Sequence, residues 1–372
     1  METTLLDNEH ETDGLRATPV PTVDPDRLDA FADKVTGDIG AAFAVLLGFM
    51  GDQTGVYRAM REYGPATAAE LAEAAGVDER YLLEWLSAQA AAGYVQYDAR
   101  GETFSLSLEQ ATVLAHEGHP AFMQGLFQQI TGQYTMHEDA IAVFRSGAGR
   151  SWNEHHACCF CGTDRAFRPG YAANLVEKWL PALDDVLDKL IAGAKVADVG
   201  CGHGSSTTLL ARAFPDSSFH GFDFHAPSID TARAAAAAAG TARNTRFTTL
   251  TAKELPAEGF DLVCMFDALH DMGDPVGAAR RIREALAPDG TFMLVEPLAG
   301  DRLGDNLHVL GQVFYAASTL ICTPASRSQE LGLALGAQAG EKRLTEVLRE
   351  AGFTRIRRAA ETPINMVLEA RP

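Results

Sequence analysis

The sequence predicts an α/β fold preceded by a mostly helical domain, and three observations support this. A short apolar run at residues 196–199 is followed by a glycine-rich turn and by a helical segment at 205–214. A second apolar run ends at Asp223, and similar runs alternate with helical segments as far as the C-terminus. The first half of the chain, by contrast, shows mainly helical periodicity.

Length, charge and cysteine usage limit the kind of protein. A chain of 372 residues suggests two domains with enough length to bury a core. The formal net charge is −19, from 31 Lys and Arg against 50 Asp and Glu, so a nucleic-acid partner is disfavoured. Six cysteines in a chain of this length do not suggest a disulfide framework. Without an export signal, and with an early apolar run at 39–50 too short to span a bilayer, we expect a cytoplasmic protein with no membrane partner.

The sequence of the N-terminal region predicts a disordered tail followed by a helix. Residues 1–23 are acidic, contain two prolines and show little periodicity, which predicts a disordered tail. A helix is expected to begin at Asp24 as N-cap, with Pro25 at its first position. Its continuation at residues 41–50 is apolar on all sides, which predicts burial or contact with a second chain. We therefore expect a homodimer formed through the N-terminal domain.

Residues 67–92 predict a helix-turn-helix. Thr67 is expected to cap the first helix, because its hydroxyl can accept a hydrogen bond from a free backbone N–H group. Gly76 is expected to end that helix, and Asp78 to begin the second.

Two short segments after the helix-turn-helix, 93–97 and 103–107, predict the β-wing of a winged helix. Residues 24–110 are therefore expected to form one winged-helix domain. Residues 24–106 hold six Lys or Arg and fourteen Asp or Glu, whereas contacts with phosphate require positive charge. DNA binding is accordingly disfavoured.

Residues 111–180 predict helices that link the two domains and cover the active site. Within them, residues 155–161 carry two imidazoles and three thiols, at Cys158, Cys159 and Cys161. One Cys-x-x-Cys pair supplies only half of a four-ligand zinc site, so no complete metal site is predicted. The cysteines are either small buried residues beside a substrate pocket or a redox-sensitive or metal-binding group.

The glycine-rich turn is the centre of the predicted binding site, because a ligand can lie against backbone that carries no Cβ. Its residues are Gly200, Cys201, Gly202 and Gly204. Asp198 precedes them, and its carboxylate would repel a pyrophosphate but suits a ligand with an ammonium group. Asp223 follows about 20 residues later, at a position where an acid accepts hydrogen bonds from ribose hydroxyls.

These residues, with the segment Pro288-Asp289-Gly290 before an expected fifth strand, resemble a class I S-adenosylmethionine (SAM)-dependent methyltransferase. The resemblance covers roughly residues 165–372. It implies a Rossmann-like domain with a seven-stranded sheet at 181–372, including a helical insertion at 299–340. It also implies SAM as cofactor and S-adenosylhomocysteine as product. The winged helix is similar to the dimerisation domain of plant-type small-molecule O-methyltransferases.

The resemblance implies further cofactor contacts. Tyr171, in a loop expected just before the first strand, would cover the cofactor. Phe224 and Asp267 follow the second and fourth strands at the binding edge. Many members of the family place an acid at the end of the third strand to meet the adenine amino group, whereas this chain has Thr251 and Ala252 there.

His270 is the candidate catalytic base. His270 and Asp271, followed by Asp274, resemble the His-Asp-Trp-x-Asp segment of plant-type O-methyltransferases, whose histidine deprotonates the acceptor hydroxyl; Met272 replaces the tryptophan. A hydroxyl is a poor nucleophile until its proton leaves, and histidine titrates near neutral pH. A nearby carboxylate would fix the tautomer of His270 and raise its basicity. Asp271 is the second candidate catalytic residue.

Substrate contacts are expected from Glu296, which follows the fifth strand, and from Asn306 and Tyr315 in the insertion. No residue identifies the acceptor. The expected function is methyl transfer from SAM to a small molecule, with a hydroxyl oxygen favoured. Methylation of nitrogen, carbon, sulfur or a metalloid on the same scaffold remains open, as does a SAM-sensing winged-helix transcriptional regulator.

Overall fold

The computed structural model of the protein describes residues 23–372. The chain divides into two units, Met1–Phe43 and Ala44–Pro372. The tail predicted for residues 1–23 lies, apart from Val23, outside the described residues.

Helix α1 (Pro25–Gln53) begins where the sequence predicts, because Oδ1 of Asp24 accepts hydrogen bonds from the backbone N–H groups of Asp26 and Arg27. From Leu28 onward, α1 carries exposed apolar side chains at helical spacing, namely Leu28, Phe31, Val35, Ile39 and Phe43. Among the described residues, α1 is the one helix whose length and apolar composition would allow it to cross a membrane. The same apolar stripe suits contact with a second chain. The expected homodimer and the expected absence of a membrane partner therefore stay predictions.

The predicted helix-turn-helix and β-wing are confirmed. They consist of α2 (Val56–Tyr63), α3 (Ala68–Ala75), α4 (Glu79–Ala91), β1 (Gln96–Asp98) and β2 (Thr103–Ser105). Thr67 caps α3 through reciprocal hydrogen bonds with Glu70, and Gly76 ends it with φ of 67°. Strands β1 and β2 pair antiparallel. The domain has its own apolar core, in which the rings of Tyr57 and Trp85 pack edge to face.

A run of helices follows in sequence before the sheet. They are α5 (Leu108–Ala115), α6 (Gln124–Tyr134), α7 (His137–Ser146), η1 (Trp152–Glu154), α8 (Ala157–Asn174), the π-helical turn η2 (Leu175–Trp179), η3 (Leu180–Ala182) and α9 (Val186–Ala192). The loop predicted around Tyr171 is wrong, because α8 continues through Pro169. On the N-terminal side of this proline, α8 packs closely on α6. A Cβ added at Gly125 or Gly162 would collide with the backbone of the facing helix.

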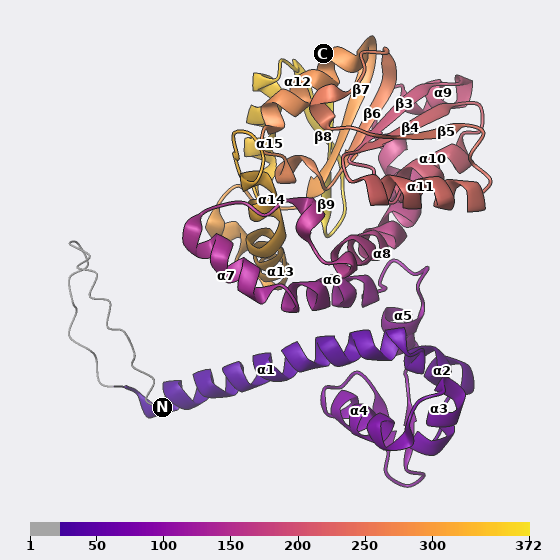
Figure 1. Ribbon diagram of the computed structural model, residues 1–372, viewed down its shortest axis with the longest axis vertical. Helices are drawn as coiled ribbons and strands as arrows, with labels where there is room; N and C mark the ends of the chain where they lie inside the picture. Colours follow the sequence, from indigo (N-terminus) through magenta and orange to yellow (C-terminus); the bar gives the residue numbers. More distant parts are fainter. Residues whose placement is uncertain (1–22) are drawn as a thin grey trace. The chain divides into compact units, whose positions relative to one another are not determined.

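The sheet has seven strands in the order β5-β4-β3-β6-β7-β9-β8 (Figure 1). They are β3 (Lys195–Val199), β4 (Ser218–Asp223), β5 (Thr245–Thr249), β6 (Phe260–Phe266), β7 (Leu286–Pro297), β8 (Arg355–Glu361) and β9 (Asn365–Arg371). Strands β3 to β7 run parallel, while β9 pairs antiparallel with both β7 and β8. The expected seven-stranded α/β domain is confirmed.

Helices cover both faces of this sheet (Figure 1). On one face, α12 (Pro275–Ala285) and α15 (Gly340–Glu350) share a core with residues of β6 and β7. On the other face, α9 and α10 (Ser205–Ala213) pack with Trp179. Helix α11 (Ala226–Ala238) packs against Phe247 of β5. Because most of these strands are buried on both faces, they read as continuous apolar runs in the sequence.

Two predicted boundaries are wrong. Pro288-Asp289-Gly290 lies inside β7 rather than before it, because β7 already pairs with β6 at Leu286. The third strand ends at Thr249 rather than Ala252, because Thr251 caps the short helix η4 (Ala252–Glu254). The insertion is helical as expected. It contains η6 (Leu303–Asn306), α13 (Val309–Ala317), η7 (Ser318–Cys322) and α14 (Thr323–Arg327).

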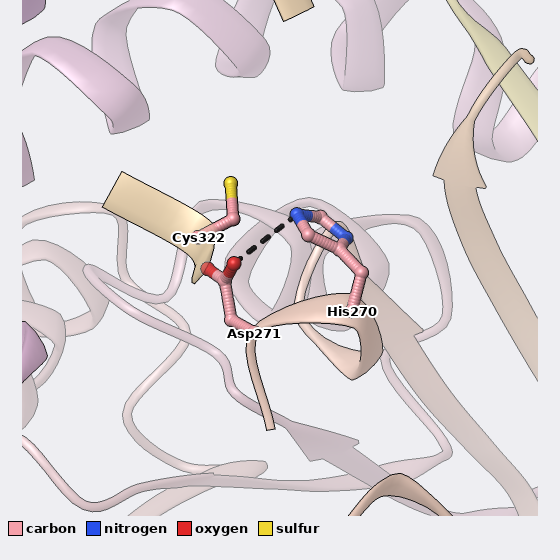
Figure 2. Close-up of side chains that lie close together, drawn as sticks. All are labelled: His270, Asp271 and Cys322. Carbon is pink, nitrogen blue, oxygen red and sulfur yellow. Dashed lines mark ion pairs between the residues drawn. The ribbon is translucent and has the colours of Figure 1, made fainter. Parts of the chain in front are cut away.

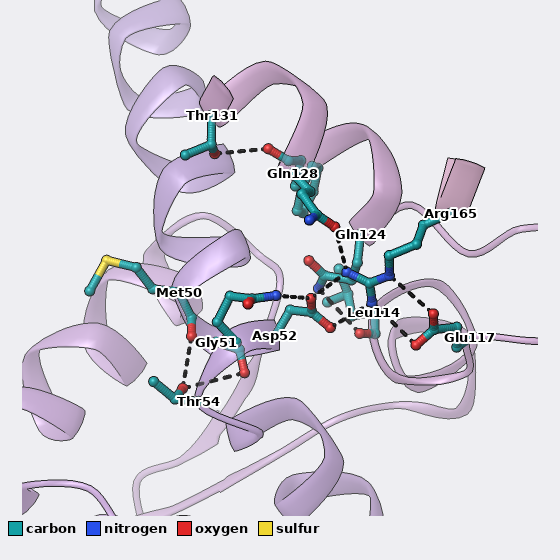
Figure 3. A network of polar contacts seen from close by, with 12 residues as sticks. Met50, Gly51, Asp52, Thr54, Leu114, Glu117, Gln124, Gln128, Thr131 and Arg165 are labelled. Carbon is teal, nitrogen blue, oxygen red and sulfur yellow. Dashed lines mark hydrogen bonds and ion pairs between the residues drawn. The ribbon is translucent and has the colours of Figure 1, made fainter. Parts of the chain in front are cut away.

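Arg165 on α8 binds two acidic side chains from elsewhere in the chain (Figure 3). Its guanidinium donates to both carboxylate oxygens of Asp52 at 2.8 and 3.2 Å, and to both of Glu117 at 3.0 and 3.2 Å. The Arg165 and Asp52 side chains each keep only 16% exposure, so this pair is largely removed from water. The bidentate geometry fixes α8 against the C-terminal end of α1.

The Arg165→Met variant should lower the free energy of unfolding by about 2–4 kcal/mol, because Asp52 would stay mostly buried without its partner. Urea denaturation followed by circular dichroism measures this. The control is Arg80→Met, which removes an exposed ion pair with Glu84 and should cost less than about 1 kcal/mol. Equal losses in the two variants would contradict the structural role of Arg165.

Candidate active site

A cavity of about 630 Å³ opens at the carboxyl ends of the parallel strands, where open α/β sheets bind ligands. Many residues predicted from the sequence line it, namely Tyr171, Gly200, Cys201, Gly202, Asp223, Phe224, Thr251, Ala252, Asp267 and Asp271. Other predicted residues lie outside its wall, namely Asp198, Gly204, His270, Glu296, Asn306 and Tyr315. The structure therefore brings together most of the expected cofactor residues.

The glycine turn between β3 and α10 forms part of this wall. Gly202 has φ of 52°, and nothing lies within 4 Å of the place a Cβ would take, so its backbone faces open space. Gly204 is required for packing instead. A Cβ there would lie 2.8 Å from the Phe247 ring and 2.9 Å from Ala232. The turn thus exposes backbone to a ligand while keeping α10 close to the sheet.

Asp198 lies beneath the turn and is 1% exposed. Its Oδ2 accepts hydrogen bonds from the hydroxyls of Ser206 and Thr207, both at 2.6 Å, which fixes the start of α10. Burial raises the pKa of Asp198 to about 6, although the two hydroxyl donors act in the opposite direction. Its Oδ1 has no hydrogen-bond partner among residues 23–372. Direct contact between Asp198 and a ligand ammonium group stays a prediction.

Asp223 locks the turn to the end of β4. Its Oδ2 accepts a hydrogen bond from the Gly202 N–H at 2.9 Å, and its Oδ1 accepts one from the His225 N–H at 2.8 Å. Burial raises the pKa of Asp223, while these donors oppose the rise. Both oxygens keep a free lone pair for a ligand hydroxyl. The adjacent Phe224 is 40% exposed and adds apolar surface to the wall.

Thr251, in the region where adenine is expected to bind, caps the short helix η4. Its hydroxyl donates to Oε2 of Glu254 at 2.8 Å as part of the cap of η4. Thr251 and Ala252 both line the cavity, so their contact with adenine stays a prediction.

Acidic side chains dominate the charge of the described cavity wall. They are Asp164, Asp223, Glu254, Asp267, Asp271, Asp274 and Glu330. The wall's single lysine, Lys253, is paired with Asp274 and Glu330, each at 2.9 Å. Such a wall favours a cationic ligand and disfavours a diphosphate.

Tyr171 and Asp267 meet at the end of β6. The Tyr171 hydroxyl donates to Oδ2 of Asp267 at 3.1 Å, and Nδ2 of Asn365 donates to Oδ1 at 2.8 Å. Burial, with a further contribution from Glu296, raises the pKa of Asp267 to about 7. The Tyr171 ring also packs on Phe266, with centroids 5.1 Å apart. Tyr171 therefore reaches the cavity wall from a helix rather than from a loop.

His270 lies between carboxylates in η5 (Leu269–Asp271). Its Nδ1 is 2.5 Å from Oε2 of Glu296, and its Nε2 is 3.3 Å from Oδ1 of Asp271. Cys322 reaches the same place from η7, as Figure 2 shows. Burial alone would lower the pKa of His270, but Glu296 and Asp271 together raise it well above the ordinary value. The two carboxylates therefore favour the protonated form of the ring.

Asn306 and Tyr315 lie outside the cavity wall. Asn306 is buried and stabilises the start of the insertion, since its Oδ1 accepts from the Gly300 N–H at 2.8 Å. Its Nδ2 donates to the Gly300 carbonyl and lies 3.5 Å from the Tyr315 hydroxyl. Their contact with substrate stays a prediction.

Several wall residues could not be identified from the sequence. Asp164 on α8 accepts a hydrogen bond from the Ser205 hydroxyl at 2.5 Å and lies beside the glycine turn. Trp152 and Phe160 line the cavity with ring centroids 5.5 Å apart. Trp152 lies just before the cysteine-rich segment 155–161, and Phe160 lies within it. That position was the one indication in the sequence, but it did not show which side chains face the cavity.

Comparison with known families separates the two domains. Residues 197–292 match a family described as a methyltransferase domain, and residues 41–116 match one described as an Rv2258c-like winged HTH domain. This part of the chain therefore carries a methyltransferase domain. The winged helix-turn-helix precedes that methyltransferase domain, as the sequence predicts.

Two curated relatives match part of the chain. The ubiquinone biosynthesis O-methyltransferase of Actinobacillus pleuropneumoniae serotype 7 (strain AP76) is 31% identical over 146 residues, covering 37% of this chain and 59% of that protein. The dimethylglycine N-methyltransferase of Parasynechococcus marenigrum (strain WH8102) is 28% identical over 131 residues, covering 35% and 46%. The chain thus spans about half the length of these relatives.

Two solved structures share the fold of the methyltransferase domain and of the helices before it. The mitomycin 7-O-methyltransferase MmcR has a TM-score of 0.69 at 20% identity, covering 94% of this chain and 100% of that one. Human N-acetylserotonin methyltransferase, solved with SAM, has a TM-score of 0.69 at 16% identity, covering 95% and 99%. At these identities the likeness shows a common fold.

The buried Asp198 should leave a pH signature on stability. Its folded pKa of about 6 lies above the ordinary 3.8, so the native state binds more protons than the unfolded state between these values. The free energy of unfolding of the protein, minus that of Asp198→Asn, should therefore fall as pH rises from about 4 to about 6, by up to about 3 kcal/mol, and then level off. Urea denaturation at a series of pH values measures this difference. A flat or rising difference would contradict the burial of an ionisable Asp198.

Proposed function

We propose that the protein transfers a methyl group from SAM to a small-molecule acceptor, most favourably to a hydroxyl oxygen. The observation that carries this is the acid-rich cavity bounded by the exposed backbone of Gly202 and by Asp223. SAM, when bound, supplies a methyl group activated on a positively charged sulfur and leaves as S-adenosylhomocysteine. Its positive charges match the acidic wall.

The residues of the wall divide the binding task. Asp223, held by two backbone N–H groups, is fixed in position to accept hydrogen bonds from ribose hydroxyls. Phe224 offers apolar surface for an adenine ring. Asp164 is hydrogen-bonded to Ser205 directly after the glycine turn, Asp267 follows β6, and we assign both wall acids to the cationic end of the ligand.

His270 is the proposed base. Glu296 fixes Nδ1 of the ring, which directs Nε2 toward Asp271, a residue of the cavity wall. Once Nε2 has lost its own proton, an acceptor hydroxyl bound beside Asp271 would pass its proton to that nitrogen while its oxygen attacks the methyl carbon. Glu296 would stabilise the imidazolium that results.

Two observations favour other candidates, and one assay separates them from this proposal. One relative is an N-methyltransferase by name, and the winged helix belongs to a family described as an HTH domain. Incubation with methyl-tritiated SAM and a panel of phenols, alcohols, amines and thiols would show which atom is methylated. Label transfer to hydroxylated acceptors supports the proposal. Transfer confined to amines or thiols would refute the oxygen assignment, and SAM-dependent DNA binding without transfer would favour a regulator.

The Asp223→Ala variant should lose SAM binding, because both the ribose contact and the lock on the Gly202 backbone disappear. The matched control is Asp230→Ala, which removes an exposed acid from α11 and should bind SAM like the parent protein. Isothermal titration calorimetry measures both. Parental affinity in Asp223→Ala would contradict the assigned binding site.

The His270→Ala variant should bind SAM normally but lose turnover by about 100-fold or more, as expected when a general base is removed. Asp271→Asn should shift the rise of activity with pH toward lower pH, because the Asp271 charge helps to hold the proton on His270. The pH dependence of kcat in the parent and this variant measures the shift. Full activity in His270→Ala, or a shift toward higher pH in Asp271→Asn, would refute the base.

A further inference from the structure

Three potential metal ligands converge at the edge of the cavity. His270 and Asp271 come from η5, while Cys322 comes from η7 about 50 residues later in the chain (Figure 2). The imidazole nitrogen, the carboxylate oxygen and the thiol sulfur all lie within 4.8 Å of one another. Nitrogen, oxygen and sulfur donors in this combination suit zinc.

Glu296 supplies the outer contact that zinc-binding histidines usually have. Its Oε2 lies 2.5 Å from Nδ1 of His270, and its Oε1 accepts the backbone N–H of Leu269 at 2.9 Å. Glu296 is 1% exposed, so this arrangement is rigid. The imidazole therefore presents Nε2 to Asp271 and Cys322, which is the geometry of a carboxylate–histidine–metal triad.

Asp271 supplies an unused ligand atom. Its Oδ1 is fully buried and has no hydrogen-bond partner among the described residues, although it faces Nε2 of His270. The ion pair with His270 across 3.3 Å balances the charge of this oxygen while the ring is protonated, and a zinc ion that displaces the Nε2 proton would take over that role. Asp271 also lines the cavity, which offers an entry path for the ion.

We propose that His270, Asp271 and Cys322 bind one zinc ion, with a fourth coordination position open to the cavity. Binding replaces the protons on the Cys322 thiol and on Nε2 of His270, and these protons leave to solvent. Zinc then occupies the atom assigned above as the base, so a zinc-loaded site is switched off for proton transfer. The binding itself does not depend on the proposed function.

The cysteines of α8 do not form this site. Cys159 is buried and packs in the same apolar cluster as Cys322, whereas Cys161 is exposed. Within residues 23–372, the three thiols of α8 do not meet in a metal-ligand group. The metalloid site considered for Cys158, Cys159 and Cys161 therefore lacks the convergence it requires.

Metal-free protein should be titrated with zinc in competition with a chromophoric chelator, and with cobalt while the thiolate-to-cobalt absorption is recorded. We expect one metal ion per chain and a charge-transfer band. The Cys322→Ser variant should lose the band and bind zinc more weakly. Glu296→Gln should weaken binding by about 10- to 100-fold while keeping the band. The matched control, Cys158→Ser with Cys161→Ser, should behave as the parent protein.

Circular dichroism melting checks that each variant is folded, and Asp271→Asn replaces any variant that is not. Absence of zinc binding in the parent protein would overturn the proposal. Unchanged binding in Cys322→Ser would also overturn it, as would loss of binding in the α8 control. If zinc binds as expected but the metal-free protein transfers no methyl group to the acceptor panel, the proposed function is refuted and the metal site stands.

Discussion

Strand β3 pairs in parallel with β4 on one side and with β6 on the other, and this pairing positions the binding edge of the sheet. Parallel strands end at the same edge, so this pairing brings together Asp198, Asp223 and Asp267 from distant parts of the sequence. Burying three acids in one place is unfavourable, and the pKa of each is raised accordingly. Each acid is therefore held by donors: hydroxyls for Asp198, backbone N–H groups for Asp223, and a phenol with an amide for Asp267. The result is a preorganised acidic edge suited to a cationic ligand.

Much of the fold could be predicted from the sequence, because the strands are buried on both faces and therefore read as short apolar runs. The caps at Asp24 and Thr67 could be predicted for a similar local reason, since each depends on atoms only two or three residues away. The features that were wrong depend on distant contacts. Pro169 indicates a break locally, but α8 continues through it and packs closely on α6 over the preceding turns.

The candidate site could be predicted only in part. Residues that directly follow a strand, such as Asp223, Phe224 and Asp267, were found because chain order alone places them at the binding edge. The partners of His270 were harder to predict, because Glu296 belongs to β7 and Cys322 to η7. The spacing of residues in the sequence carries no information about such contacts. It therefore did not show that Glu296 holds the histidine, and the expected contact of Glu296 with substrate stays a prediction.

Calorimetric titration of the protein with SAM, and separately with NAD⁺, measures whether the cavity selects a cationic ligand over a diphosphate. The acidic wall and the exposed Gly202 backbone predict one SAM bound per chain and no heat of binding from NAD⁺, whose diphosphate meets repulsion at this edge. Binding of NAD⁺, or the absence of SAM binding by folded protein, would contradict the account.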